Sequence, residues 1–147
     1  MPPGSSSTLN PQSFTARGLS VTDLSALDTW LDRYIVAWRS NDADTIRELF
    51  THDAVYRWHP WESLTEGARD REEIVEAWLK EPDDPESWTM FCEPLAVNGD
   101  LGVARCVTTY EATGEAPKRR YHNILIARLD DEGRCRDFTE LFMQEPD

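Results

Sequence analysis

The sequence is poor in positive charge. It carries 15 Lys and Arg residues against 28 Asp and Glu residues, which gives a formal net charge of −13. Nucleic acids and anionic membranes are polyanions, so this charge argues against both as partners. No apolar run approaches the roughly 20 residues that span a bilayer, and the N-terminus does not show the basic-then-apolar layout of a signal peptide. These absences predict a protein of the cytoplasm.

Cysteine is scarce as well. The chain has three cysteines, Cys92, Cys106 and Cys135, and no two have the C-x-x-C spacing of a zinc or redox site. Each lies in an apolar or alternating stretch, so we expect three reduced core residues in a reducing compartment, with a catalytic thiol as the alternative. The three histidines have no ligand spacing and no Gly-rich phosphate loop is present, so we expect neither a metal nor a cofactor.

The length of 147 residues suits one domain. Residues 1–20 contain three prolines, a run of three serines and no acidic residue. Such a composition buries too little apolar surface to offset chain entropy, so it predicts a flexible tail. Residues 21–147 are then expected to form a single domain.

Hydrophobic periodicity changes along the chain from helical to extended. Thr22 is a plausible N-cap for a helix with apolar positions from Leu24 to Trp38, and Asp42 and Asp70 can cap two later helices. The strand-like segments are residues 54–59, 88–97, 101–110, 121–129 and 134–143. Helices followed by an antiparallel meander predict an α+β fold in which a curved sheet wraps over the helices.

Several motifs carry a family resemblance. They are Tyr34–Trp38, Asn41–Asp44, Ile46–Phe50 and Asp53–Tyr56, then Gly67 with Ile74 and Trp78, and finally Asp130–Cys135 with Phe138–Glu140. Together they resemble the SnoaL-like branch of the nuclear transport factor 2-like superfamily. The resemblance covers roughly residues 24–144.

This resemblance implies a cone-shaped α+β roll, with a strongly bent mixed sheet around the N-terminal helices and a pocket inside. Members of the superfamily include polyketide cyclases, ketosteroid isomerase, scytalone dehydratase and limonene epoxide hydrolase, and most form dimers through the outer sheet face. We therefore expect a homodimer. The chemistry must be argued from individual residues, because the fold alone does not assign it.

The comparison with ketosteroid isomerase suggests two catalytic positions. Tyr34 aligns with the tyrosine that holds the developing oxyanion there, although it could equally be a core tyrosine. The usual aspartate base before the strand-ending proline is missing, and with a one-residue insertion His59 takes its place. The alternative for His59 is a histidine at the pocket rim or the surface. Leu125 occupies the position of the second oxyanion donor, which is therefore absent.

Strand alternation adds further candidates. Glu140 shares a face with Phe138 and Phe142, and such apolar surroundings would raise the pKa of a carboxyl; the alternative is a structural pair between Glu140 and Arg105. Asn123 is expected to face inward, although a one-residue slip would bring His122 inward instead.

Trp58 and Trp61 flank His59 and are candidates for the pocket mouth. Taken together, the residues predict a cofactor-independent enzyme that performs isomerisation, cyclisation or dehydration on an apolar, carbonyl-bearing small molecule. Tyr34 would polarise an oxygen, His59 or Glu140 would carry the proton, and the ligand would be oriented by Arg105 and Asn123. The alternative is a non-catalytic ligand-binding or dimerisation module of the same fold.

Overall fold

The computed structural model describes residues 22–62 and 66–147, so the predicted tail lies outside the described residues. Three helices and five strands follow one another along the chain. They are α2 (Leu24–Ser40), α3 (Ala43–Arg47), β2 (Phe50–Arg57), α4 (Arg71–Lys80), β3 (Trp88–Asn98), β4 (Leu101–Tyr110), β5 (Arg119–Leu129) and β6 (Cys135–Gln144). Among these described elements, no helix is both long and apolar enough to cross a membrane.

Each helix begins at an aspartate whose side chain accepts a hydrogen bond from a backbone N–H of the first turn. Asp42 and Asp70 act as predicted. Helix α2 begins one residue later than expected, because its N-cap is Asp23 and not Thr22. The backbone N–H of Thr22 instead donates to the carbonyl of Gly99 at 2.8 Å, which ties the start of the helix to the β3–β4 turn.

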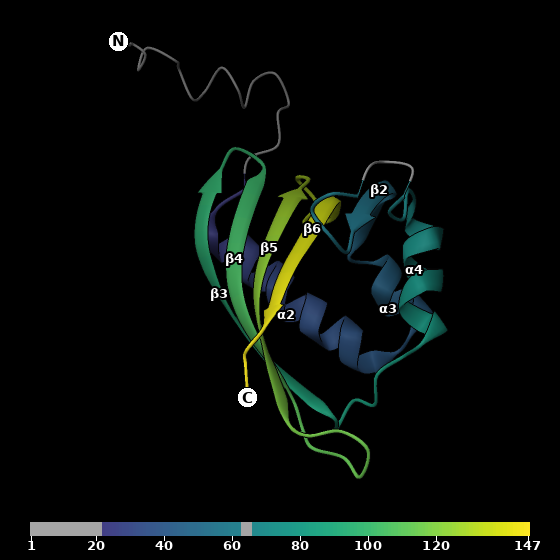
Figure 1. Cartoon of the computed structure of the whole chain (residues 1–147). Helices are drawn as coiled ribbons and strands as arrows, with labels where there is room; N and C mark the ends of the chain where they lie inside the picture. The colour runs from purple at the N-terminus through teal and green to yellow at the C-terminus, as the bar shows by residue number, and fades with distance from the viewer. Residues whose placement is uncertain (1–21, 63–65) are drawn as a thin grey trace.

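The five strands form one sheet in the order β2-β6-β5-β4-β3. Strands β3 to β6 are the predicted antiparallel meander, and β2 joins β6 in parallel, which makes the sheet mixed. The sheet is bent but not closed, and α2 lies across its concave side, whereas α3 and α4 lie together beside β2 (Figure 1). This architecture confirms the α+β roll.

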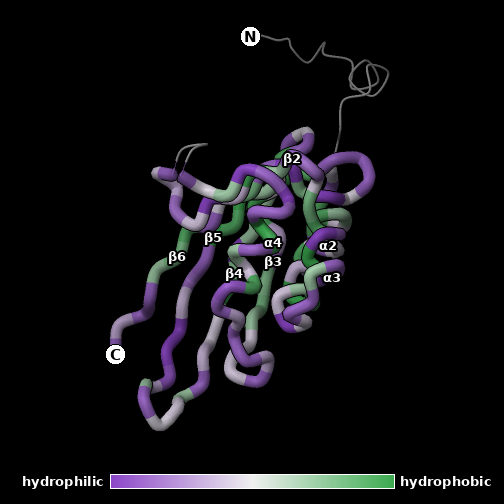
Figure 2. The backbone as a smooth tube through the Cα atoms, turned by 90° about the vertical axis from the view of Figure 1, so that its right-hand side faces the viewer, coloured by the Kyte–Doolittle hydropathy of each residue, from purple (hydrophilic) through white to green (hydrophobic). Residues whose placement is uncertain are grey.

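Core packing explains why α2 lies on the concave side. Trp30, Phe50 and Phe138 are fully buried between the helix and the sheet, and the indole of Trp30 donates a hydrogen bond to the carbonyl of Leu49 at 3.1 Å. Hydrophobic and hydrophilic residues alternate along the elements, as expected when each buries one face (Figure 2). The connection between β4 and β5 extends past the helical layer in both views (Figures 1 and 2).

The prediction of three reduced cysteines is wrong. Cys92 on β3 lies directly opposite Cys106 on β4, and the two form a disulfide. Their separation of 14 residues did not suggest this, because the pairing depends on the strand register. Only Cys135 is a free thiol among the described residues, and its burial raises its pKa. The prediction of a reducing compartment loses its support.

Candidate functional site

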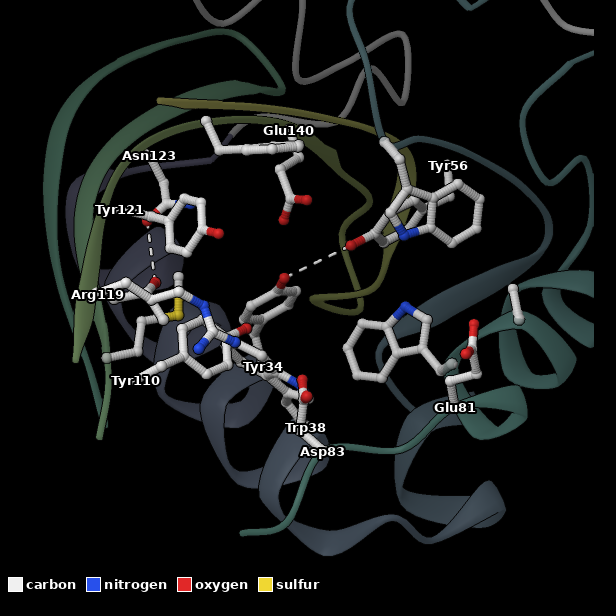
Figure 3. A pocket seen from close by; sticks show the side chains of 16 residues that line it. Tyr34, Trp38, Tyr56, Glu81, Asp83, Tyr110, Arg119, Tyr121, Asn123 and Glu140 are labelled. Atoms are coloured by element: carbon white, nitrogen blue, oxygen red, sulfur yellow. Dashed lines mark hydrogen bonds between the residues drawn. The ribbon is translucent and has the colours of Figure 1, made fainter. Parts of the chain in front are cut away.

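A cavity of about 380 Å³ lies between α2, the α4 region and the concave side of the sheet. Half of its 16 lining residues are aromatic, and β3, β4, β5 and β6 each contribute at least one side chain (Figure 3). Volumes of this size are typical of small-molecule sites, which combine apolar walls with a few converging polar groups.

Two tyrosine hydroxyls meet at one wall of the cavity. Tyr34 comes from the buried face of α2 and Tyr56 from an inward position of β2, and their oxygens are 3.5 Å apart. The ring of Tyr34 stacks on Phe138, with centroids 5.6 Å apart. Burial raises the pKa of both hydroxyls well above 10, so both stay protonated and can donate hydrogen bonds. The alternation Ala54–Tyr56 in the sequence could have indicated Tyr56.

Glu140 extends from β6 into the same space. Its carboxyl group faces the hydroxyl of Tyr34 (Figure 3). Burial raises the pKa of this carboxyl to about 7, and the hydrogen-bonding Tyr34 hydroxyl and the charge of His59 act in the opposite direction. The structure therefore brings together Tyr34 and Glu140, two of the three residues predicted from the sequence to be catalytic.

Arg105 is not in the cavity, so its prediction as a ligand-binding residue is wrong. It is exposed on the outer face of β4, where its guanidinium donates to Glu93 at 2.8 Å. The physical reason is strand alternation, because its neighbours Ala104 and Cys106 take the inward positions. The structural pair between Arg105 and Glu140 is excluded for the same reason.

His59 does not line the cavity. Its ring stacks on Trp61 at a centroid distance of 4.7 Å, and its Nδ1 lies 3.1 Å from a carboxylate oxygen of Glu62. Trp61 is 74% exposed and also lies outside the lining. The strand ends at Arg57, before the predicted residue 59, so His59 belongs to the following turn. Its assignment as a proton carrier is therefore not supported by its position.

The other predicted ligand-binding residues divide between wall and core. Trp58 and Phe142 line the cavity, as predicted. Phe138 is fully buried under Tyr34 and does not reach the cavity.

Asn123 faces inward, and its side-chain oxygen accepts a hydrogen bond of 2.9 Å from the Thr108 hydroxyl. His122 faces outward and lies 2.8 Å from Glu145, which settles the register question in favour of Asn123.

Sequence reasoning missed several wall residues, among them Trp38, Trp78, Tyr110 and Arg119. Trp38 and Trp78 looked like ordinary core positions of helices. Arg119 was missed because the strand was expected to start at residue 121, whereas β5 starts at 119. Within the described ranges, no group of three His, Cys, Asp or Glu residues could hold a metal ion.

A bent sheet that folds over one long helix and encloses a lined cavity defines the cone-shaped roll of NTF2-like proteins. The solved structures agree with this class. An NTF-2-like protein of unknown function from Burkholderia xenovorans matches with a TM-score of 0.60 and 14% identity, over 84% of this chain and 87% of that one. Residues 31–138 match the family model described as the SnoaL-like domain. The chain therefore belongs to the SnoaL-like family.

Two further structures have the same fold. A proposed ketosteroid isomerase from Kribbella flavida matches with a TM-score of 0.62 and 15% identity, over 86% of this chain and 84% of that one. IdmH, a proposed polyketide cyclase from Streptomyces antibioticus, matches with a TM-score of 0.58 and 22% identity, over 78% of this chain and 90% of that one. No match was found among curated proteins.

Proposed function

We propose that the protein catalyses cofactor-independent proton transfer beside a carbonyl group of an apolar small molecule. One observation carries the proposal: Glu140 is a buried carboxyl with a pKa of about 7 that faces a protonated tyrosine hydroxyl inside a cavity. A general base works best when its pKa lies near the working pH. The names of the similar structures, an isomerase and a cyclase, are consistent with this class of reaction.

The proposed reaction begins when ionised Glu140 takes a proton from the carbon next to the substrate carbonyl. The electron pair of the broken C–H bond moves into the carbonyl, whose oxygen becomes an enolate. The hydroxyl of Tyr34 donates a hydrogen bond to that oxygen, and the neighbouring hydroxyl of Tyr56, 3.5 Å from it, supports the donor. Protonated Glu140 then returns the proton to a carbon or a leaving oxygen, so no electron acceptor is needed.

Proton exchange tests this proposal without knowledge of the natural substrate. NMR can follow the loss of the α-protons of 2-tetralone in D2O with the wild type, E140Q and E93Q. We expect E140Q to reduce the enzyme-dependent exchange rate by about 100-fold or more. E93Q is the matched control, because Glu93 is exposed on the outer face and pairs with Arg105. Equal rates for E140Q and the wild type would contradict the proposal.

The same experiment separates the alternative function. A ligand-binding module would bind the ketone without accelerating exchange. Binding can be followed through the fluorescence of Trp58, which lines the cavity. Quenching of the wild type but not of a W58F variant, together with no exchange above the buffer rate, would assign the cavity to ligand binding alone.

We further propose that two copies of the chain associate through the outer sheet face. Phe91 and Met143 are 75% and 76% exposed and lie on one row across the strands. Large exposed apolar side chains are common at interfaces. Sedimentation should show a dimer for the wild type and a monomer for F91E, and a monomeric wild type would refute this assembly.

A further inference from the structure

We propose that the ligand of this cavity is a fused-ring carboxylic acid whose carboxylate pairs with Arg119. This inference rests on the proposed function and specifies its substrate class. It concerns a basic residue in a strongly acidic chain, at a wall that the reaction described above does not use.

Arg119 lacks the carboxylate partner that its neighbours have. Lys118 and Arg120 each lie 3.9 Å from a glutamate oxygen, of Glu111 and Glu145 respectively. Arg119 lines the cavity, and no carboxylate of the described residues lies within ion-pair distance of it. A cation that lacks an ion pair and lies at the wall of a ligand cavity is suited to bind an anion.

The guanidinium of Arg119 is held in place by an aromatic ring. Its central carbon lies 4.5 Å from the centroid of the Tyr110 ring, a cation–π geometry. Stacking of this kind uses the face of the guanidinium and leaves its N–H edge free for a bidentate contact with a carboxylate. Tyr110 therefore orients the side chain without neutralising its charge.

Further hydrogen-bond donors lie along the same strand. Arg119, Tyr121 and Asn123 alternate along β5 and all line the cavity (Figure 3). The Thr108 hydroxyl occupies the side-chain oxygen of Asn123, so the amide nitrogen remains available to donate to a ligand oxygen. The β5 wall is thus a strip of donors that fits an oxygen-rich, anionic end of a ligand.

The charges around the cavity favour a carboxylate over a phosphate. Asp83 and Glu140 also line the cavity, and both would repel an anion. One guanidinium can balance a single negative charge, whereas the second charge of a phosphate monoester would face these two carboxyls without compensation. The ligand is therefore a monoanion.

Register places the carboxylate far from the reacting carbon. Glu140 lies opposite Leu125 on β5, six residues along the strand from Arg119. At ~3.4 Å per residue these backbone positions are about 20 Å apart, and the long arginine side chain closes part of that distance. The carboxylate and the reacting carbonyl therefore belong to opposite ends of a ligand. The aromatic side chains between them suit the flat faces of fused rings.

Matched probes test the inference. Isothermal titration calorimetry compares naphthalene-2-carboxylate with 2-naphthamide, its neutral analogue of similar shape. We expect the wild type to bind the acid about tenfold more tightly, and R119Q to lose this preference. R120Q is the control, because Arg120 lies at an outward position of the same strand. Equal binding of both probes by the wild type, or a preference that persists in R119Q, would overturn the inference.

Two additional variants guard against misfolding of R119Q. R119K keeps the charge and should retain part of the preference, whereas D83N removes a repelling carboxylate and should strengthen binding of the acid. A wild-type preference that is unchanged in both variants would contradict a direct contact in this part of the cavity.

The exchange assay separates this inference from the proposed function. With 6-carboxy-2-tetralone, R119Q should raise KM while leaving the exchange rate of neutral 2-tetralone unchanged. Exchange of both ketones without any effect of R119Q would support the proposed function and refute the carboxylate site. Preferential binding of the acid without exchange would support the carboxylate site and refute the proposed function.

Discussion

Replacement of Glu140 by glutamine should make the protein more stable at alkaline pH. The folded state holds the pKa of this carboxyl at about 7, above its ordinary value of 4.5, because burial disfavours the charged form. Below pH 4.5 the carboxyl is protonated in both the folded and the unfolded state, and the residue resembles glutamine. As the pH rises towards 7, the unfolded chain releases the proton first, so the free energy of unfolding falls.

The size of this effect follows from the two pKa values. The difference between about 7 and 4.5 corresponds to about 3 kcal/mol once the group is ionised in both states. Glutamine avoids this penalty, so the wild type and E140Q should be similar in stability near pH 4.5. E140Q should become the more stable protein above pH 7, by an amount that approaches this value. Stability and catalysis would then oppose each other at this position.

Urea unfolding of both proteins at several pH values between 4.5 and 8.5 measures this difference. E93Q serves as the control, because Glu93 is exposed and its replacement reports the removal of a surface charge. A stability difference between E140Q and the wild type that stays constant over this pH range would refute the reasoning. It would mean that Glu140 is not buried as an ionisable group.

Two further predictions concern the framework of the site. A Cβ at Gly67 would overlap the backbone oxygen of Tyr56, so G67A should lower the free energy of unfolding by about 1–3 kcal/mol, whereas G114A, which meets nothing within 4 Å, should change it by less than about 0.5 kcal/mol in thermal or urea unfolding. Thiol titration without reductant should find no reactive cysteine in the native protein and one, Cys135, after denaturation; three reactive thiols would disprove the disulfide.

The fold was largely predictable because it depends on local patterns. The alternation from residue 121 to 129 identified the inward face of β5, and the aspartates before two of the helices identified where those helices begin. The parallel pairing of β2 with β6 and the disulfide were not predictable from such patterns. Both depend on which segments, distant in the sequence, become neighbours in the folded sheet.

The site was predictable only in part, for a related reason. Tyr34 and Glu140 belong to regular elements, whose periodicity shows the direction of each side chain. His59 lies in a turn after the strand, where alternation no longer holds, and Arg105 was assigned to the wrong face of its strand. Arg119 was missed because a shift of two residues at a strand end decided whether it belonged to the sheet.

The pKa of Glu140 is the quantity on which both the proposed chemistry and the stability argument depend. NMR titration of a protein labelled with 13C at the glutamate carboxyl, with E140Q to assign the signal, measures it directly. We expect an apparent pKa of about 7 in the wild type, and a higher pKa in Y34F, because the Tyr34 hydroxyl stabilises the carboxylate. A pKa near 4.5 that does not respond to Y34F would contradict the account.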